Sequence, residues 1–127
     1  MNNQQFIHHL TNLTTSRFAL NQLCDDDFKA FHHRLLSEFD IQSTSNDWHL
    51  IGTKGCHLCD EVNHLLSQVN ATKTLPNICQ LDLTDANDDF LIDTLGLTIP
   101  VLLTPKKILC YPFGVMDIFS LVHHRAF

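Results

Sequence analysis

The sequence predicts an α/β domain preceded by a helical extension, and three observations predict it. Beyond about residue 47, short apolar segments alternate with segments of helical periodicity, as strands and helices do in a compact α/β unit. Two cysteines three residues apart, Cys56 and Cys59, open one helical segment directly after the first predicted strand. Before residue 47, apolar residues repeat only at helical spacing. We therefore divide the chain into a helical extension, residues 1–46, and an α/β domain, residues 47–127.

The extension contains two amphipathic segments. Their apolar residues are spaced for one weak helix and for a second, stronger one. Their apolar positions are Phe6, Ile7, Leu10 and Leu13, and then Phe28, Phe31, Leu35 and Phe39. Asp25 to Asp27 are placed to cap the second helix and to charge its N-terminus, and the polar residues 42–47 are typical of a linker. We expect the aromatic face to fold back on the α/β domain; the alternative is an arm that binds a partner.

The α/β domain is predicted element by element from periodicity and turn residues. Strands are expected at 48–53, 78–83, 100–104 and 107–111, the last two joined by a turn at Pro105-Lys106. Helices are expected at about 57–70, at about 86–95 where Gly96 ends the segment, and over 115–122. The resulting order is βαβ followed by ββα.

The cysteine pair is the main chemical signal. Two thiols three residues apart at a helix start lie on one face, close enough to form a disulfide. The free N–H groups and positive dipole end of that first turn favour a thiolate at Cys56. Half of a zinc site remains an alternative for such a pair, but zinc would need a second close pair of ligands, and Cys79 and Cys110 lack that spacing. We expect no metal.

A second motif lies downstream, where the apolar run from Leu97 to Leu103 contains Pro100. A strand, a CxxC helix and then Ile-Pro before a short apolar strand resembles the thioredoxin superfamily. Within it, the sequence is most similar to small bacterial glutaredoxin-like proteins with a Gly-Cys-His-Leu-Cys-Asp motif, here Gly55 to Asp60. The resemblance covers roughly residues 48–124 and does not reach the extension.

The resemblance implies a thioredoxin-like fold of the glutaredoxin type, a four-stranded mixed sheet with flanking helices. It implies a thiol–disulfide oxidoreductase in which Cys56 is the nucleophile and Cys59 the buried resolving thiol. It also implies a cis bond before Pro100, with the backbone of the Thr98-Ile99-Pro100 segment free to pair with a substrate. Lys54 and His57 are candidates to support the thiolate or substrate. Glutathione is a candidate electron donor, and no cofactor is required.

A competing hypothesis is a non-catalytic thioredoxin-like binding module whose helical arm recruits a protein. In either case the net charge of −6 argues against a nucleic-acid surface. No apolar run approaches the roughly 18 residues of a membrane helix, and the first residues do not resemble a secretory signal. We therefore expect a cytoplasmic monomer that acts on protein or glutathione disulfides. We further expect Cys79 and Cys110 to be buried apolar residues, and Cys24 to be exposed.

Overall fold

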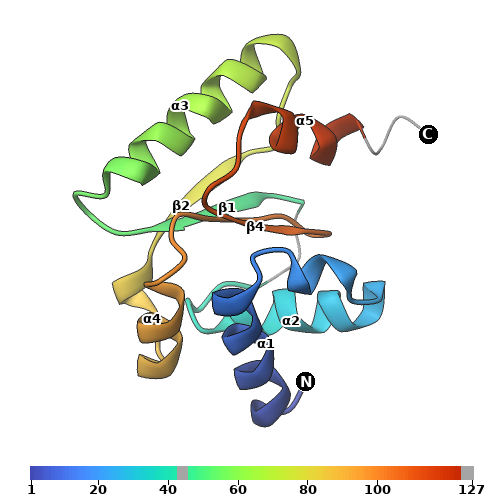
Figure 1. The fold of residues 1–127 in the computed structure, drawn as a ribbon, viewed down its shortest axis with the longest axis vertical. Helices are drawn as coiled ribbons and strands as arrows, with labels where there is room; N and C mark the ends of the chain where they lie inside the picture. The colour runs from blue at the N-terminus through green and yellow to red at the C-terminus, as the bar shows by residue number, and fades with distance from the viewer. Residues whose placement is uncertain (43–45, 124–127) are drawn as a thin grey trace.

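The structure is a computed structural model that describes residues 1–42 and 46–123. Residues 43–45 of the predicted linker lie outside the described residues. Figure 1 shows the elements, which in chain order are α1 (Asn3–Thr15), the 3-10 turn η1 (Ala19–Gln22), α2 (Asp25–Ser37), β1 (Trp48–Gly52), α3 (His57–Thr72), β2 (Ile78–Asp82), the 3-10 turn η2 (Leu83–Asp85), α4 (Asp89–Leu95), β3 (Val101–Leu103), β4 (Ile108–Cys110) and α5 (Val115–His123).

The strands form one four-stranded mixed sheet in the order β2-β1-β3-β4. β1 pairs parallel with β2, whereas β3 pairs antiparallel with both β1 and β4. Helices α3 and α5 cover one face of the sheet, and α1, α2 and α4 lie on the other (Figure 1). The predicted βαβ and ββα order and the mixed sheet are therefore confirmed.

Alternating side chains of the strands feed two separate cores. On β3, Val101 and Leu103 point into a core with α1, α2 and α4, which we call the extension-side core. Leu102, between them, points into a core with α3 and α5, which we call the dithiol-side core. This alternation follows from the two-residue repeat of a strand. The sheet therefore needs apolar cover on both faces.

The extension provides most of the cover on its face. Phe28, Phe31 and Leu35 are buried in the extension-side core, and Phe39 packs against it. The rings of Phe6 and Phe31 lie 5.6 Å apart between centroids, which joins α1 to α2 in the same cluster. The expected folding of the aromatic face onto the α/β domain is thus what the structure has.

Polar contacts fix the position of the extension at two points. The Asn21 side chain donates to the Ile108 carbonyl and accepts from the Ile108 amide, both at 2.9 Å, on the edge strand β4. Asn87 donates its amide to the Glu38 carbonyl at 2.8 Å and its side chain to Asp40 at 3.1 Å. Asn21 thus satisfies the amide and the carbonyl of Ile108 on an edge strand, where free backbone groups could pair with another chain.

Several predicted boundaries are wrong by a few residues. The helix expected from about 86 begins at Asp89, because residues 83–85 form η2 and the Asp88 side chain accepts from Phe90 and Leu91 to cap α4. The two C-terminal strands are shorter than predicted, at three residues each, and α3 extends to Thr72. Asp25 to Asp27 lie inside the first turn of α2, so they charge it but do not cap it; the cap is Cys24.

Among the described residues, no helix is both long and apolar enough to cross a membrane.

Candidate functional site

The cysteine pair Cys56 and Cys59, which we call the dithiol, lies between the end of β1 and the first turn of α3. Gly55, with φ of +74°, turns the chain into the helix, a backbone conformation that glycine adopts without steric cost. Cys56 and Cys59 form a disulfide with their Cα atoms 5.2 Å apart, within the range usual for a disulfide. Cys59 is buried at 8% exposure and Cys56 is half-buried. Cys56 is therefore the more accessible of the two residues.

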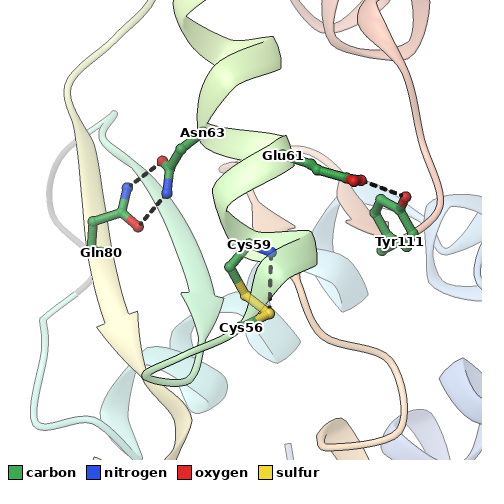
Figure 2. The surroundings of a disulfide bond; sticks show 6 residues. All are labelled: Cys56, Cys59, Glu61, Asn63, Gln80 and Tyr111. Atoms are coloured by element: carbon green, nitrogen blue, oxygen red, sulfur yellow. Dashed lines mark hydrogen bonds between the residues drawn. A yellow bond between two sulfur atoms is a disulfide. The ribbon is translucent and has the colours of Figure 1, made fainter.

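Cys56 is the N-cap residue of α3. Its Sγ accepts a hydrogen bond from the Cys59 amide at 3.1 Å, a bond visible in Figure 2. The sulfur thus occupies the place of a capping oxygen, at the positive end of a helix of 16 residues. Both effects stabilise a negative charge on this sulfur when the disulfide is reduced.

Gly52, the last residue of β1, allows the close approach of Cys59 to the sheet. A Cβ atom at Gly52 would lie 2.5 Å from Cys59 Sγ, so no larger residue fits without displacing that sulfur. Gly52 is not among the site residues predicted from the sequence. Its position at the end of an apolar strand, just before the cysteine pair, could have indicated it, because a glycine in a strand often marks the close approach of another group.

Two pairs of polar side chains hold the start of α3 against its neighbours, as Figure 2 shows. Asn63 and Gln80 exchange hydrogen bonds at 2.9 and 3.3 Å, which joins α3 to β2. On the other side, the Tyr111 hydroxyl donates to Glu61 at 3.1 Å, and this bond raises the pKa of Tyr111. Side-chain hydrogen bonds therefore connect α3 to β2 on one side and to Tyr111, just after β4, on the other.

The Thr98-Ile99-Pro100 segment enters β3 at the dithiol end of the sheet. The Ile99–Pro100 bond is cis, as expected, and so is the Tyr111–Pro112 bond. Val101 pairs with Ile51, so the register brings Pro100 level with Gly52, the residue beside Cys59. The expectation of a free backbone holds only in part. The Thr98 and Ile99 amides both donate to the Leu95 carbonyl, at 2.8 and 3.1 Å, because the end of α4 continues as a turn into this segment, and the Pro100 carbonyl accepts from the Tyr111 amide at 3.1 Å.

Lys54 and His57 are both exposed. Lys54 lines a groove of about 350 Å³ together with Cys59 and Asp82. Hydrogen bonds from Thr84 are the main cause of the lowered pKa of Asp82, and the charge of Lys54 adds to the effect. His57 lines a second groove on the other side of α3, with Glu61 and Tyr111. The two candidates thus lie in separate grooves, one on each side of the helix.

The remaining cysteines lie away from this pair. Cys110 is buried in the extension-side core as predicted, and burial raises the pKa of its thiol to about 11. Cys79 is only half-buried, contrary to expectation. It lies on the outer strand β2, where its sulfur contacts the polar side chains of Asn77 and Asp47 at 3.5 and 3.9 Å, whereas the extension packs on the other outer strand, β4, which carries Cys110. Cys24 is exposed. Within residues 1–42 and 46–123, no group of three or more His, Cys, Asp or Glu side chains could hold a metal ion.

Comparison with known families agrees with this geometry. The family model of the glutaredoxin-like domain (DUF836) matches residues 48–120, which is more than half of the chain and spans β1 to α5. No curated protein and no solved structure matches the sequence. The match includes the cysteine pair, Gly52 and Pro100 but leaves out the extension. The chain therefore belongs to the glutaredoxin-like family, with an additional helical cover on one face of its sheet.

Proposed function

We propose that this protein is a thiol–disulfide oxidoreductase that works through Cys56 and Cys59. The observation that carries the proposal is the position of Cys56: its sulfur caps α3 and accepts the Cys59 amide, while Cys59 lies buried directly behind it. A helix N-terminus favours the thiolate over the thiol, and the thiolate is the form that attacks disulfides.

The reaction proceeds in two exchanges. The Cys56 thiolate attacks one sulfur of a substrate disulfide, which forms a mixed disulfide and releases the other substrate sulfur as a thiolate that takes a proton from water. The Cys59 thiolate then attacks Cys56 Sγ, which closes the Cys56–Cys59 disulfide and releases the second substrate thiol. Two electrons pass from the protein dithiol to the substrate disulfide, so no further cofactor is needed.

The neighbouring residues have supporting roles in this proposal. The Thr98-Ile99-Pro100 segment docks the substrate beside the dithiol, with the Ile99 carbonyl rather than its amide as the pairing group. Lys54 and His57 place positive charge or hydrogen-bond donors on either side of the reacting sulfurs. A thiol reductant, either glutathione or a protein dithiol, returns the disulfide to the dithiol, as the reducing cytoplasm would allow.

Single-cysteine variants test the proposal. With a small neutral disulfide as substrate, Cys56→Ser should abolish exchange, because no attacking thiolate remains. Cys59→Ser should still attack but should accumulate a mixed disulfide on Cys56, measurable by intact mass. Exchange that survives Cys56→Ser would contradict the assignment, and Cys110→Ser serves as the matched control for loss of a thiol outside the pair.

The competing hypothesis, a scaffold whose arm recruits a partner, has less support. The aromatic face that such an arm would present is buried in the extension-side core. If reduced Cys56 and Cys59 prove equally inert toward small disulfides, the scaffold hypothesis regains weight.

A further inference from the structure

Three exposed apolar side chains belong to segments that adjoin the dithiol end of the sheet. Leu58, Leu97 and Met116 are 38, 78 and 77% exposed. Each lies in a connection that begins or ends with a strand at that end of the sheet. Leu58 comes after the end of β1, Leu97 before the start of β3 and Met116 after the end of β4. Because β3 runs antiparallel to both neighbours, these three strand ends lie on the same side of the sheet.

In the two grooves beside the dithiol, carboxylates outnumber lysine and arginine side chains. Asp60, Asp82 and Asp85 line the groove that contains Cys59, and Glu61 lines the groove on the other side of α3. Among the described residues that line these two grooves, Lys54 is the one lysine or arginine, and His57 and His64 line the second groove. Lys73 caps the far end of α3, and Lys106 and Lys107 lie at the turn between β3 and β4, at the opposite end of the sheet.

This combination disfavours glutathione as the oxidised substrate. Glutathione carries two carboxylates against one ammonium group, so binding beside several carboxylates would place like charges together. It also has no apolar side chain to cover Leu97 or Met116. A polypeptide with an apolar residue next to its cysteine and basic residues nearby would satisfy both features.

We propose that the Leu58, Leu97 and Met116 surface together with the acidic grooves selects polypeptide disulfides whose cysteines are flanked by apolar and basic residues. This inference rests on the proposed function, since it names the substrate class of the same dithiol. The apolar side chains bury the residue next to the substrate cysteine, and the carboxylates attract the basic residues and steer the approach.

The test uses the reduced full-length protein and a matched set of disulfide-linked peptide dimers. In the set, the residue before cysteine is Leu or Ser and the residue after it is Lys or Glu. Bis(2-hydroxyethyl) disulfide is the small neutral reference, and oxidised glutathione is the competing substrate. We expect the Leu/Lys dimer to react about tenfold faster than the Ser/Glu dimer and than oxidised glutathione. The part of this preference that is due to charge should disappear in about 1 M salt, and the apolar part should persist.

Substitutions at the exposed positions locate the effect. Leu97→Ser combined with Met116→Ser should lower the ratio of the Leu-peptide rate to the small-disulfide rate by about fivefold. Leu121→Ser is the control, since Leu121 is a partly exposed leucine that lines a pocket with Pro105 and Lys106 at the opposite end of the sheet, and it should leave the ratio unchanged. Each variant is compared with the unaltered protein in thermal unfolding, to establish that the fold is retained.

Two results would overturn the inference, and they differ from each other. If the small neutral disulfide reacts but oxidised glutathione or the Ser/Glu dimer reacts as fast as the Leu/Lys dimer, the substrate class is wrong while the oxidoreductase proposal stands. If no disulfide reacts with the reduced protein, the proposed function itself fails.

Discussion

The two faces of the sheet differ in the helices that cover them and in the environment that they give to a cysteine. The face covered by the extension is apolar and aromatic, with Phe6 and Phe31 at 0% exposure and with Cys110 buried in the same core. The opposite face is covered by α3 and α5, and its helix α3 begins with a cysteine that is partly open to solvent. The same residue type thus meets two environments within one small sheet.

The comparison shows how the fold separates stability from chemistry. Burial raises the pKa of the Cys110 thiol to about 11, which keeps that sulfur protonated and inert. Cys56 instead has a helix N-terminus and an amide donor at its sulfur. If the separation holds, changes on the extension side should affect unfolding, and changes beside α3 should affect thiol exchange.

Deletion of residues 1–46 should have the largest effect. It would remove the buried side chains of the extension and expose the sheet face formed by Ile51, Val101 and Ile108. Each large buried side chain contributes roughly 1.5–3 kcal/mol, so together they rival the roughly 5–15 kcal/mol of a typical domain. We expect the truncated chain to lack a cooperative thermal transition in circular dichroism. A truncated protein as stable as the whole chain would show that the extension is a separate arm.

Gly52→Ala tests the face that carries the dithiol. The added methyl group would displace Cys59 Sγ, so we expect slower resolution of the mixed disulfide and a loss of about 1–3 kcal/mol of stability. Quenched-flow exchange and urea unfolding measure the two effects. Gly114→Ala is the control, since a Cβ atom there meets nothing within 4 Å. Equal behaviour of the two variants would remove Gly52 from the site.

Asn21→Ala tests the extension side in the converse way. The variant would leave both backbone groups of Ile108 on the edge of β4 without their side-chain partner. We expect a loss of about 1–2 kcal/mol in urea unfolding and an unchanged rate of thiol exchange in the folded protein. A slowed exchange with unchanged stability would contradict the division between the faces.

The buried histidines of the extension side should make stability fall in acid. His32 is 3% exposed, and burial, with His49 and His33 nearby, lowers its pKa from 6.5 to about 4; burial also lowers the pKa of His49, although Asp47 opposes this. Below pH 6.5 the unfolded chain binds a proton that the folded protein excludes, so stability is lost as pH falls from about 6.5 toward 4. His32 alone should remove about 1 kcal/mol between pH 7 and 5.5.

Urea unfolding at several pH values measures this loss. His32→Gln should weaken the dependence of the free energy of unfolding on pH. His8→Gln should not, since His8 is an exposed histidine on α1. An equally steep fall in the His32 variant would show that other groups cause it.

The sequence predicted those parts of the fold that depend on local periodicity. The α/β order, the CxxC helix start and the burial of Phe28 and Phe31 follow from the spacing of residues within single segments, because a helix and a strand each repeat with a fixed number of residues. What it missed depends on contacts between distant segments. The closeness of Gly52 to Cys59, and the pairing of Asn21 with Ile108 across 87 residues, have no local signature. Cys79 was predicted to be buried because it lies in an apolar run, but which of the two outer strands the extension covers depends on contacts between distant segments.

Competitive alkylation of the reduced protein tests the central claim most directly. Cysteines are labelled with a small neutral reagent across pH and identified in peptides by mass, so that Cys56 and Cys110 are compared in the same molecule. The account predicts that Cys56 reacts first, with a midpoint below the free value of about 8.5, and that Cys110 stays unreactive until well above it. Equal rates, or a Cys56 midpoint at or above the free value, would contradict the account.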